Sequence, residues 1–205
     1  MRGRCSRPNL FLLAVTIMLG AASSVQAHLV NTGFGPFYDG FMHLFVTPED
    51  LLPVIAIALL AGLRGPRFGR TVLFALPVGW IAGSIIGPVF APPLSLSTPE
   101  IILTLGLGAL LAADWPLPLA VIAGLGILLG LMHGILNAND LAKTPSSGQL
   151  VLLGVMVALF VSVSILAGQA ASVQVRWART VVRVVGSWIA AIGFLMLGWA
   201  MRAPA

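Results

Sequence analysis

Long apolar stretches dominate this chain, and they recur from residue 51 to residue 200 with only short polar breaks between them. Hydrophobic residues make up 59% of the 205 residues and charged residues only 8%, and the mean hydropathy is +1.04. A soluble protein averages about 25% charged residues, and a globule of this length has too little interior to hide so much apolar surface. A membrane-spanning helix needs about 20 largely apolar residues. The sequence therefore predicts an all-α, polytopic transmembrane helix bundle.

The first 27 residues have the three parts of a secretory signal peptide. Three arginines within residues 2–7 form a basic start, residues 10–20 are apolar, and Ala27 ends the segment with a small residue at the expected cleavage position. The alternative is an uncleaved first membrane helix. Cleavage would remove Cys5, the only cysteine, and so would exclude disulfides. It would also leave His28 as the N-terminus, where an amine and an imidazole together can chelate a metal.

Residues 28–205 are predicted to form one domain of six transmembrane helices. Proline at the first helical position with an acid beside it marks a helix start, and this pattern occurs in Thr47-Pro48-Glu49 and again in Thr98-Pro99-Glu100. Arginine clusters and proline-rich turns separate the apolar segments. The six predicted spans are residues 47–63, 71–90, 98–113, 119–137, 149–168 and 180–200.

The arginines between the spans predict the orientation. Loops rich in lysine and arginine stay in the cytoplasm, and two such loops, residues 64–70 and 176–183, follow the first and fifth spans. This places both ends of the mature chain on the periplasmic side of a bacterial inner membrane, whereas the turn at Asp114 has no basic residue and gives no signal. The basic residues thus indicate topology, so we expect the lipid bilayer, and no nucleic acid, as a partner.

Two groups of ionisable residues adjoin apolar spans, where such residues are costly and usually functional. One group lies in residues 39–50, where Asp39 and His43 have helical i, i+4 spacing, and the other lies in residues 133–140. The predicted topology puts both groups on one side of the membrane, at the periplasmic ends of spans one and four. We expect them to face each other and to hold a divalent metal ion. The candidate ligands are His28, Asp39, His43, Glu49, Asp50, His133, Asn137 and Asp140.

Several candidates also have a purely structural explanation. Glu100 stands in the same Thr-Pro-Glu pattern as Glu49 with no histidine nearby in the sequence, so Glu49 can simply stabilise a helix N-terminus. Asp50 is the more specific acid, because Ile101 takes its place in the second pattern. Asn137 and Asp140 can cap the end of span four, just as His43 can lie in a loop before span one.

Two backbone features add to the picture of the site. Pro53 has no N–H group, so the carbonyl of Glu49 loses its helical partner and can face a cation. Glycines spaced four residues apart in spans two and four form ridges that allow close helix packing. In span four this ridge adjoins His133 and can press it against a neighbouring helix. The ridges are Gly79, Gly83 and Gly87 in span two, and Gly126, Gly130 and Gly134 in span four.

These residues resemble the HupE/UreJ family of nickel and cobalt permeases. The resemblance includes Gly35-Pro36-Phe37-Tyr38-Asp39-Gly40 and both polar groups. The family has a histidine, five residues and Asp-His in its first span, where this chain has His43, five residues and Glu49-Asp50. In its fourth span the family has Phe-His-Gly-x-Ala-His-Gly-x-Glu, which corresponds to residues 132–140 here.

The resemblance implies a six-span permease whose cargo is nickel or cobalt, with no permanently bound cofactor. His43 and His133 match the family's histidines, while Asp50 and Asn137 stand where the family has two others. Oxygen donors favour harder ions such as manganese or magnesium. Three interpretations stay open: a weaker nickel carrier, a carrier for another divalent ion, and a relative that has lost transport.

The sequence contains no motif of an enzyme among those searched for. It has no His-Glu-x-x-His helix, no Gly-x-Ser-x-Gly turn and no phosphate-binding loop. We therefore expect a non-enzymatic protein that does not pump on its own. The competing hypothesis is a non-transporting integral membrane protein that binds metal for a partner, and partners in metalloenzyme maturation are left open.

Overall fold

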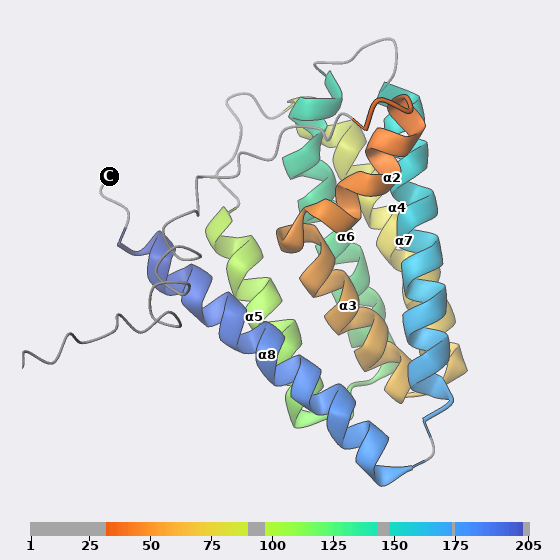
Figure 1. Cartoon of the computed structure of the whole chain (residues 1–205), viewed down its shortest axis with the longest axis vertical. Coiled ribbons are helices and arrows are strands. Elements are labelled where there is room, and N and C mark those ends of the chain that lie inside the picture. The colour runs from red at the N-terminus through yellow and green to blue at the C-terminus, as the bar shows by residue number, and fades with distance from the viewer. Residues whose placement is uncertain (1–31, 90–96, 143–147, 174, 203–205) are drawn as a thin grey trace, which may run out of the picture.

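A computed structural model describes residues 32–89, 97–142, 148–173 and 175–202, and the predicted signal peptide with His28 lies outside these residues. All regular structure in the described part is helical, in agreement with the all-α prediction. Figure 1 shows the helices side by side in one bundle. They are α2 (Pro36–Val46), α3 (Pro48–Leu63), α4 (Pro66–Ile86) with the short 3-10 helix η1 (Gly87–Val89), α5 (Ser97–Ala113), α6 (Leu119–Ala142), α7 (Gly148–Ala171) and α8 (Arg176–Ala200).

Helices α2 and α3 form one bent pair rather than a loop followed by a helix. Thr47 joins them in an extended conformation, and the two axes meet at 72°. The bend has a local cause, because a residue before proline is disfavoured in the helical conformation and Pro48 cannot donate a backbone hydrogen bond. The suggestion that His43 lies in a loop is therefore wrong, since it belongs to α2 and is buried.

The helix lengths agree with a multi-pass membrane protein. Among the described residues, four helical segments are long and apolar enough to cross a membrane by themselves, and the bent α2–α3 pair is a fifth candidate. Helix α5 is a shorter apolar helix, so six spans stay a prediction. Helix α4 begins at Pro66 instead of residue 71, because Gly65 turns the chain at φ +111° and Pro66 starts the helix. The segments are Pro66–Val89, Leu119–Ala138, Gly148–Ala171 and Arg176–Ala200.

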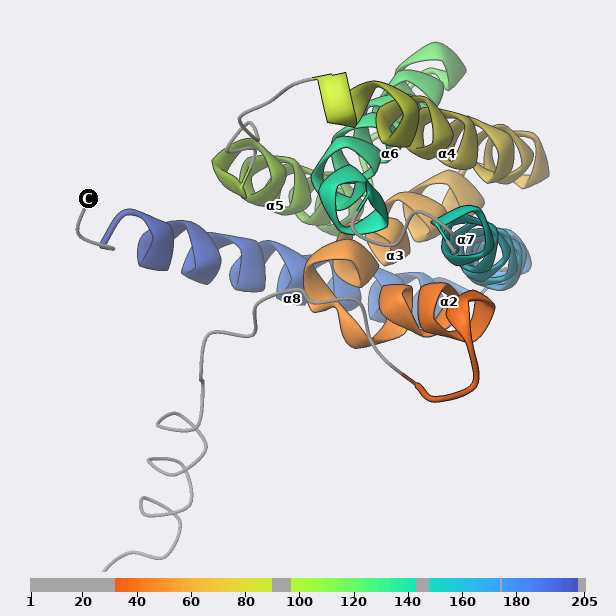
Figure 2. The same cartoon turned by 90° about the horizontal axis from the view of Figure 1, so that it is seen from above.

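Glycines bring α4 and α6 into close backbone contact, as the two ridges predict. A Cβ atom on Gly79 would lie 2.3 Å from the carbonyl oxygen of Ile127, and one on Gly130 would lie 2.2 Å from that of Leu76. Helix α3 lies in the middle of the bundle (Figure 2), and most of its residues from Val54 onward are buried. The core is therefore built around α3, the helix that carries Asp50.

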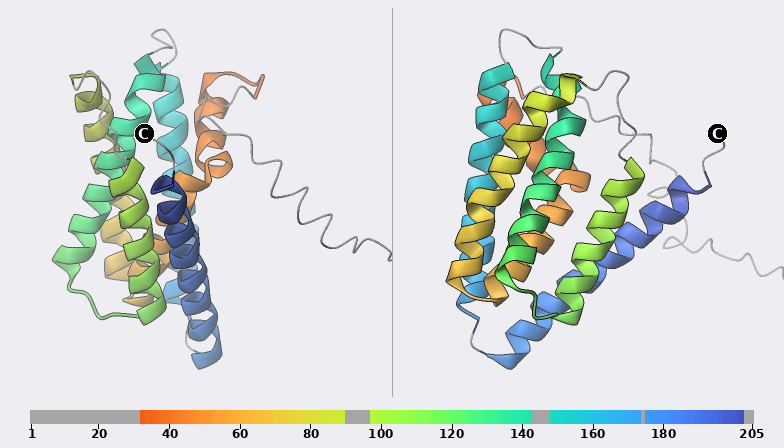
Figure 3. Two further views of the ribbon diagram at one scale, coloured as in Figure 1. Left: turned by 90° about the vertical axis from the view of Figure 1, so that its left-hand side faces the viewer. Right: turned by 180° about the vertical axis from the view of Figure 1, so that it is seen from behind.

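Helices α5 and α8 form a second pair beside the rest of the bundle (Figure 3). Asp114, in the turn after α5, joins this pair to α3, because its carboxylate accepts hydrogen bonds from Arg64 and from Arg179. The Arg179 hydrogen bond holds the pKa of Asp114 below its usual range. The two arginine-rich loops and the Asp114 turn thus lie at the same end of the bundle, which is the arrangement that the predicted topology requires.

Candidate metal centre

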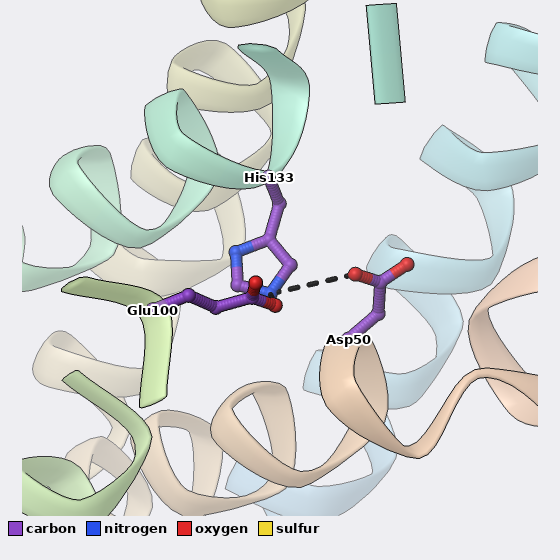
Figure 4. A group of neighbouring side chains, drawn as sticks. All are labelled: Asp50, Glu100 and His133. Atoms are coloured by element: carbon purple, nitrogen blue, oxygen red, sulfur yellow. Dashed lines mark ion pairs between the residues drawn. The ribbon is translucent and has the colours of Figure 1, made fainter. Parts of the chain in front are cut away.

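Three ionisable side chains from three helices meet inside the bundle (Figure 4). Asp50 comes from the first turn of α3, Glu100 from the first turn of α5, and His133 from the middle of α6. Each offers a ligand atom, and these atoms all lie within 4.8 Å of one another. Nε2 of His133 is 3.2 Å from Oε1 of Glu100 and 3.4 Å from Oδ1 of Asp50.

The spacing and charge of this group suit a bound cation. Donor atoms that surround one ion at bond lengths of about 2.0–2.2 Å stand roughly 3 Å apart, close to the distances observed. Asp50 is 4% exposed and His133 is completely buried. Two carboxylates in such a place carry a strongly unfavourable desolvation cost unless a positive charge lies between them.

The orientation of His133 is fixed by its surroundings. Nδ1 lies 3.0 Å from the carbonyl oxygen of Leu129, which can only accept a hydrogen bond, so Nδ1 carries a hydrogen. Nε2 faces the carboxylate oxygens of Asp50 and Glu100, which only accept hydrogen bonds, so it donates to them as part of an imidazolium. On losing that hydrogen, Nε2 can bind a metal ion, with Nδ1–H still held by Leu129. The indole of Trp80 packs on the imidazole with ring centres 5.2 Å apart, as expected if the glycine ridge presses His133 against its neighbour.

Further polar side chains extend the group from Asp50 toward α2. Oδ2 of Asp50 lies 3.2 Å from Nε2 of His43 and accepts a hydrogen bond from the amide of Asn137 at 3.4 Å. Nε2 of His43 is also 3.2 Å from Oδ1 of Asn137. The structure therefore brings together four of the predicted residues, His43, Asp50, His133 and Asn137, around the bend between α2 and α3.

Glu49 contributes its backbone rather than its side chain to the contacts of the centre. Its carbonyl oxygen lies 3.4 Å from Nε2 of His133, which agrees with the expectation that Pro53 leaves this carbonyl without a helical partner. The carboxylate of Glu49 is on an exposed residue and borders, together with Glu100, a cavity of about 10 Å³. Such a cavity holds about one water molecule.

One predicted ligand that the structure describes, Asp39, does not join this centre. Asp39 accepts hydrogen bonds from the backbone N–H and the hydroxyl of Thr32, at 2.7 and 2.6 Å, and so it fixes the segment before α2. Asp39 is also absent from the metal-ligand group found in the described residues. His28 and the side chain of Asp140 lie outside the part of the chain that the structure describes.

The centre lies deeper in the bundle than the helix ends. Figure 1 shows the bend between α2 and α3 well below the end at which α6 finishes and α7 begins. The sequence predicts a site at the periplasmic end of span one, because Thr47-Pro48-Glu49 is typical of a helix start. Helix α2 precedes that point and forms a bent pair with α3, so Asp50 lies beside the break within the pair and not at its outer end.

Glu100 is the ligand candidate that the sequence prediction missed. Its Thr-Pro-Glu pattern repeats that of Glu49, and the pattern alone is consistent with an acid that stabilises a helix start. In the structure the carboxylate of Glu100, like that of Asp50, reaches Nε2 of His133. The repeat was the available signal, because it places an acid in the first turn of two helices that run in the same direction.

The fold and the buried group define a class: a multi-pass membrane helix bundle with histidine and carboxylate side chains converging at a broken helix. The chain belongs to the HupE/UreJ protein family, which matches residues 16–196 and so most of the chain. No curated protein and no solved structure matches it at a significant level.

Proposed function

We propose that this protein is a permease for a divalent transition-metal cation, with nickel or cobalt as the cargo. The single observation that carries the proposal is the buried Asp50–Glu100–His133 group, whose donor atoms converge from three helices. Membership of the HupE/UreJ family supports a role in nickel or cobalt transport or in an accessory step. We place the arginine-rich end in the cytoplasm of an inner membrane, following the positive-inside rule.

The donor set supports a transition metal that is held loosely. Imidazole nitrogen suits nickel, cobalt, copper and zinc, whereas carboxylate oxygen suits manganese and magnesium. Here Nε2 of His133 combines with two carboxylates, and His43 adds a second imidazole beside Asp50. A carrier benefits from moderate affinity, because an ion that cannot leave its site is not conducted.

The broken helix supports transport through the same site. Non-helical backbone at membrane depth is tolerated where it is buried in protein or lines a pathway. Near the bend, the carbonyl oxygen of Glu49 contacts Nε2 of His133. It accepts no hydrogen bond from residue 53 of the same helix, because that residue is proline. A backbone oxygen of this kind can replace one water of the ion's hydration shell.

Uptake of radioactive nickel and cobalt into proteoliposomes tests the proposal. We expect wild-type protein to accumulate the ion inside vesicles along an imposed gradient, and His133→Ala to abolish accumulation. Asp39→Asn is the matched control, because Asp39 binds Thr32 outside the centre, and it should keep wild-type uptake. Unchanged uptake by His133→Ala would show that the site is wrong.

The second candidate function is a membrane protein that binds metal without transporting it. The complete burial of His133, and its contacts with other members of the group, favour this alternative because they leave the centre closed. In the same vesicles a binder would saturate at a stoichiometric amount of ion and leave the vesicle interior empty. A carrier continues to accumulate ion until the gradient is spent.

A further inference from the structure

A groove of about 450 Å³ lies between α4 and α7, at the end of the bundle that carries the arginine-rich loops. Its volume is within the range of about 300–1,000 Å³ that small-molecule sites occupy. The groove runs along the start of α4 and the end of α7, both of which are candidate membrane spans. It is lined by Pro66, Gly69, Arg70, Leu73, Val163, Ser164, Ala167, Gly168, Ala171 and Ser172.

Small residues leave this space open. Gly69 and Ala167 approach closely at the floor, where a Cβ atom on Gly69 would lie 3.0 Å from that of Ala167. Gly168 is different, because a Cβ atom built there has no heavy atom within 4 Å. A larger side chain at residue 168 would therefore fill the groove without meeting the backbone of another helix.

The rim of the groove carries positive charge that no protein carboxylate neutralises in the described residues. Arg70 is exposed, and its one hydrogen bond given by the structure runs from Nε to the carbonyl of Pro66 at 3.4 Å. Arg67 is exposed one turn earlier in α4. The carboxylate found at this end, Asp114, is engaged by Arg64 and Arg179 instead.

We infer that the groove binds one anionic phospholipid, with the headgroup phosphate on Arg70 and an acyl chain along Leu73 and Gly168. Guanidinium groups recognise phosphate through charge-assisted hydrogen bonds, and basic pockets between membrane helices are a common setting for acidic lipid headgroups. The start of α4 adds its positive helix dipole, while the last carbonyls of α7 are partly satisfied by the N–H of Ser172. The inference requires membrane embedding only and is independent of metal transport.

Native mass spectrometry of the purified full chain, released from vesicles of equal phosphatidylglycerol and phosphatidylcholine, tests this inference. We expect wild-type protein to retain one phosphatidylglycerol in preference to phosphatidylcholine. Arg70→Gln should reduce that preference by roughly fivefold, the effect of one basic residue near a membrane surface. Gly168→Leu should reduce retention of both lipids, because the new side chain occupies the groove.

Two matched controls separate the groove from general effects. Gly124→Leu adds the same side chain at another exposed helical glycine with nothing within 4 Å, and it should keep the lipid. Arg202→Gln removes one exposed positive charge after α8 and should keep the preference. Equal retention of the two lipids, or wild-type retention by Gly168→Leu, overturns the inference. A change of oligomeric state in Gly168→Leu, without a change in bound lipid, overturns it in favour of a second copy of the chain.

Discussion

Oε1 of Glu100 lies 3.2 Å from Nε2 of His133, although Glu100 is in the first turn of α5 and His133 is in the middle of α6. Because His133 is fully buried and its Nδ1 is hydrogen-bonded to the carbonyl of Leu129, the imidazole ring is held with Nε2 toward Glu100. It joins α5, and with it the α5–α8 pair, to the centre formed by α3 and α6. A ligand that pulls these two residues together or apart therefore acts on two parts of the bundle.

Glu100→Gln should weaken metal binding and uptake by roughly tenfold or more. The amide keeps the size of the side chain but loses the negative charge that balances a cation, and even outer-shell partners of metal ligands typically contribute about tenfold or more. Equilibrium binding of nickel to purified protein measures the effect. Glu49→Gln is the matched control, because in the described residues its exposed carboxylate forms no ion pair with His133, and the substitution keeps the backbone carbonyl that contacts Nε2. Equal losses in the two variants would contradict the assignment.

Pro53→Ala should lower metal affinity while leaving the fold intact. Alanine restores a backbone N–H, which binds the Glu49 carbonyl and withdraws it from the centre. If the contact of this carbonyl contributes about 1 kcal/mol, as a typical hydrogen bond does, its loss lowers the metal affinity by roughly fivefold. The same change at Pro77, inside α4, is the control. Titration with cobalt compares the two variants. An unchanged cobalt affinity in Pro53→Ala would show that the Glu49 carbonyl does not bind the ion.

Gly130→Val should destabilise the bundle and disturb the centre. The Cβ atom would lie 2.2 Å from the carbonyl oxygen of Leu76 and 2.7 Å from the backbone nitrogen of Trp80, so α4 and α6 have to separate. Overpacking of this kind costs about 1–3 kcal/mol or more. Thermal unfolding in detergent measures it against Gly124→Val, where a Cβ atom meets open space; equal melting temperatures would show that the close approach is not needed.

Asp114 should make the stability of the bundle depend on pH. Its folded-state pKa is lowered, chiefly by the hydrogen bond from Arg179, so its contribution is present above the ordinary pKa of about 4 and is lost as the pH falls through the folded value. Asp114→Asn should therefore lower the melting temperature at neutral pH and flatten the acid limb of the stability profile. Arg179 is 41% exposed on its side chain, so added salt should reduce the difference. A variant with the wild-type acid limb would contradict this.

The helices were largely predictable because their signals are local. The length of the apolar segments predicted a membrane helix bundle. Pro48 and Pro99 predicted where α3 and α5 begin to within two residues. His133 and Asn137 lie four residues apart and so share one face of α6, and both contact Asp50. Each of these properties depends on neighbours within a few turns.

The choice of ligands was not predictable in the same way. Asp39 and Glu100 are both acids near a helix start, yet one binds Thr32 and the other reaches His133. The local sequence favours the wrong acid, because Asp39 has His43 four residues away whereas Glu100 has no histidine nearby. The difference arises from the packing of α5 beside α3 and from the 72° bend at Thr47.

By itself, the sequence determined that this chain is a helical membrane protein and where most of its helices begin and end. It also proposed eight candidate ligands, of which four meet on α2, α3 and α6. Tertiary structure alone decided that the centre is buried below the helix ends and that Glu100 belongs to it. The physical reason is range: hydropathy and capping act along one helix, whereas a shared ion site depends on how the glycine-lined faces of separate helices pack together.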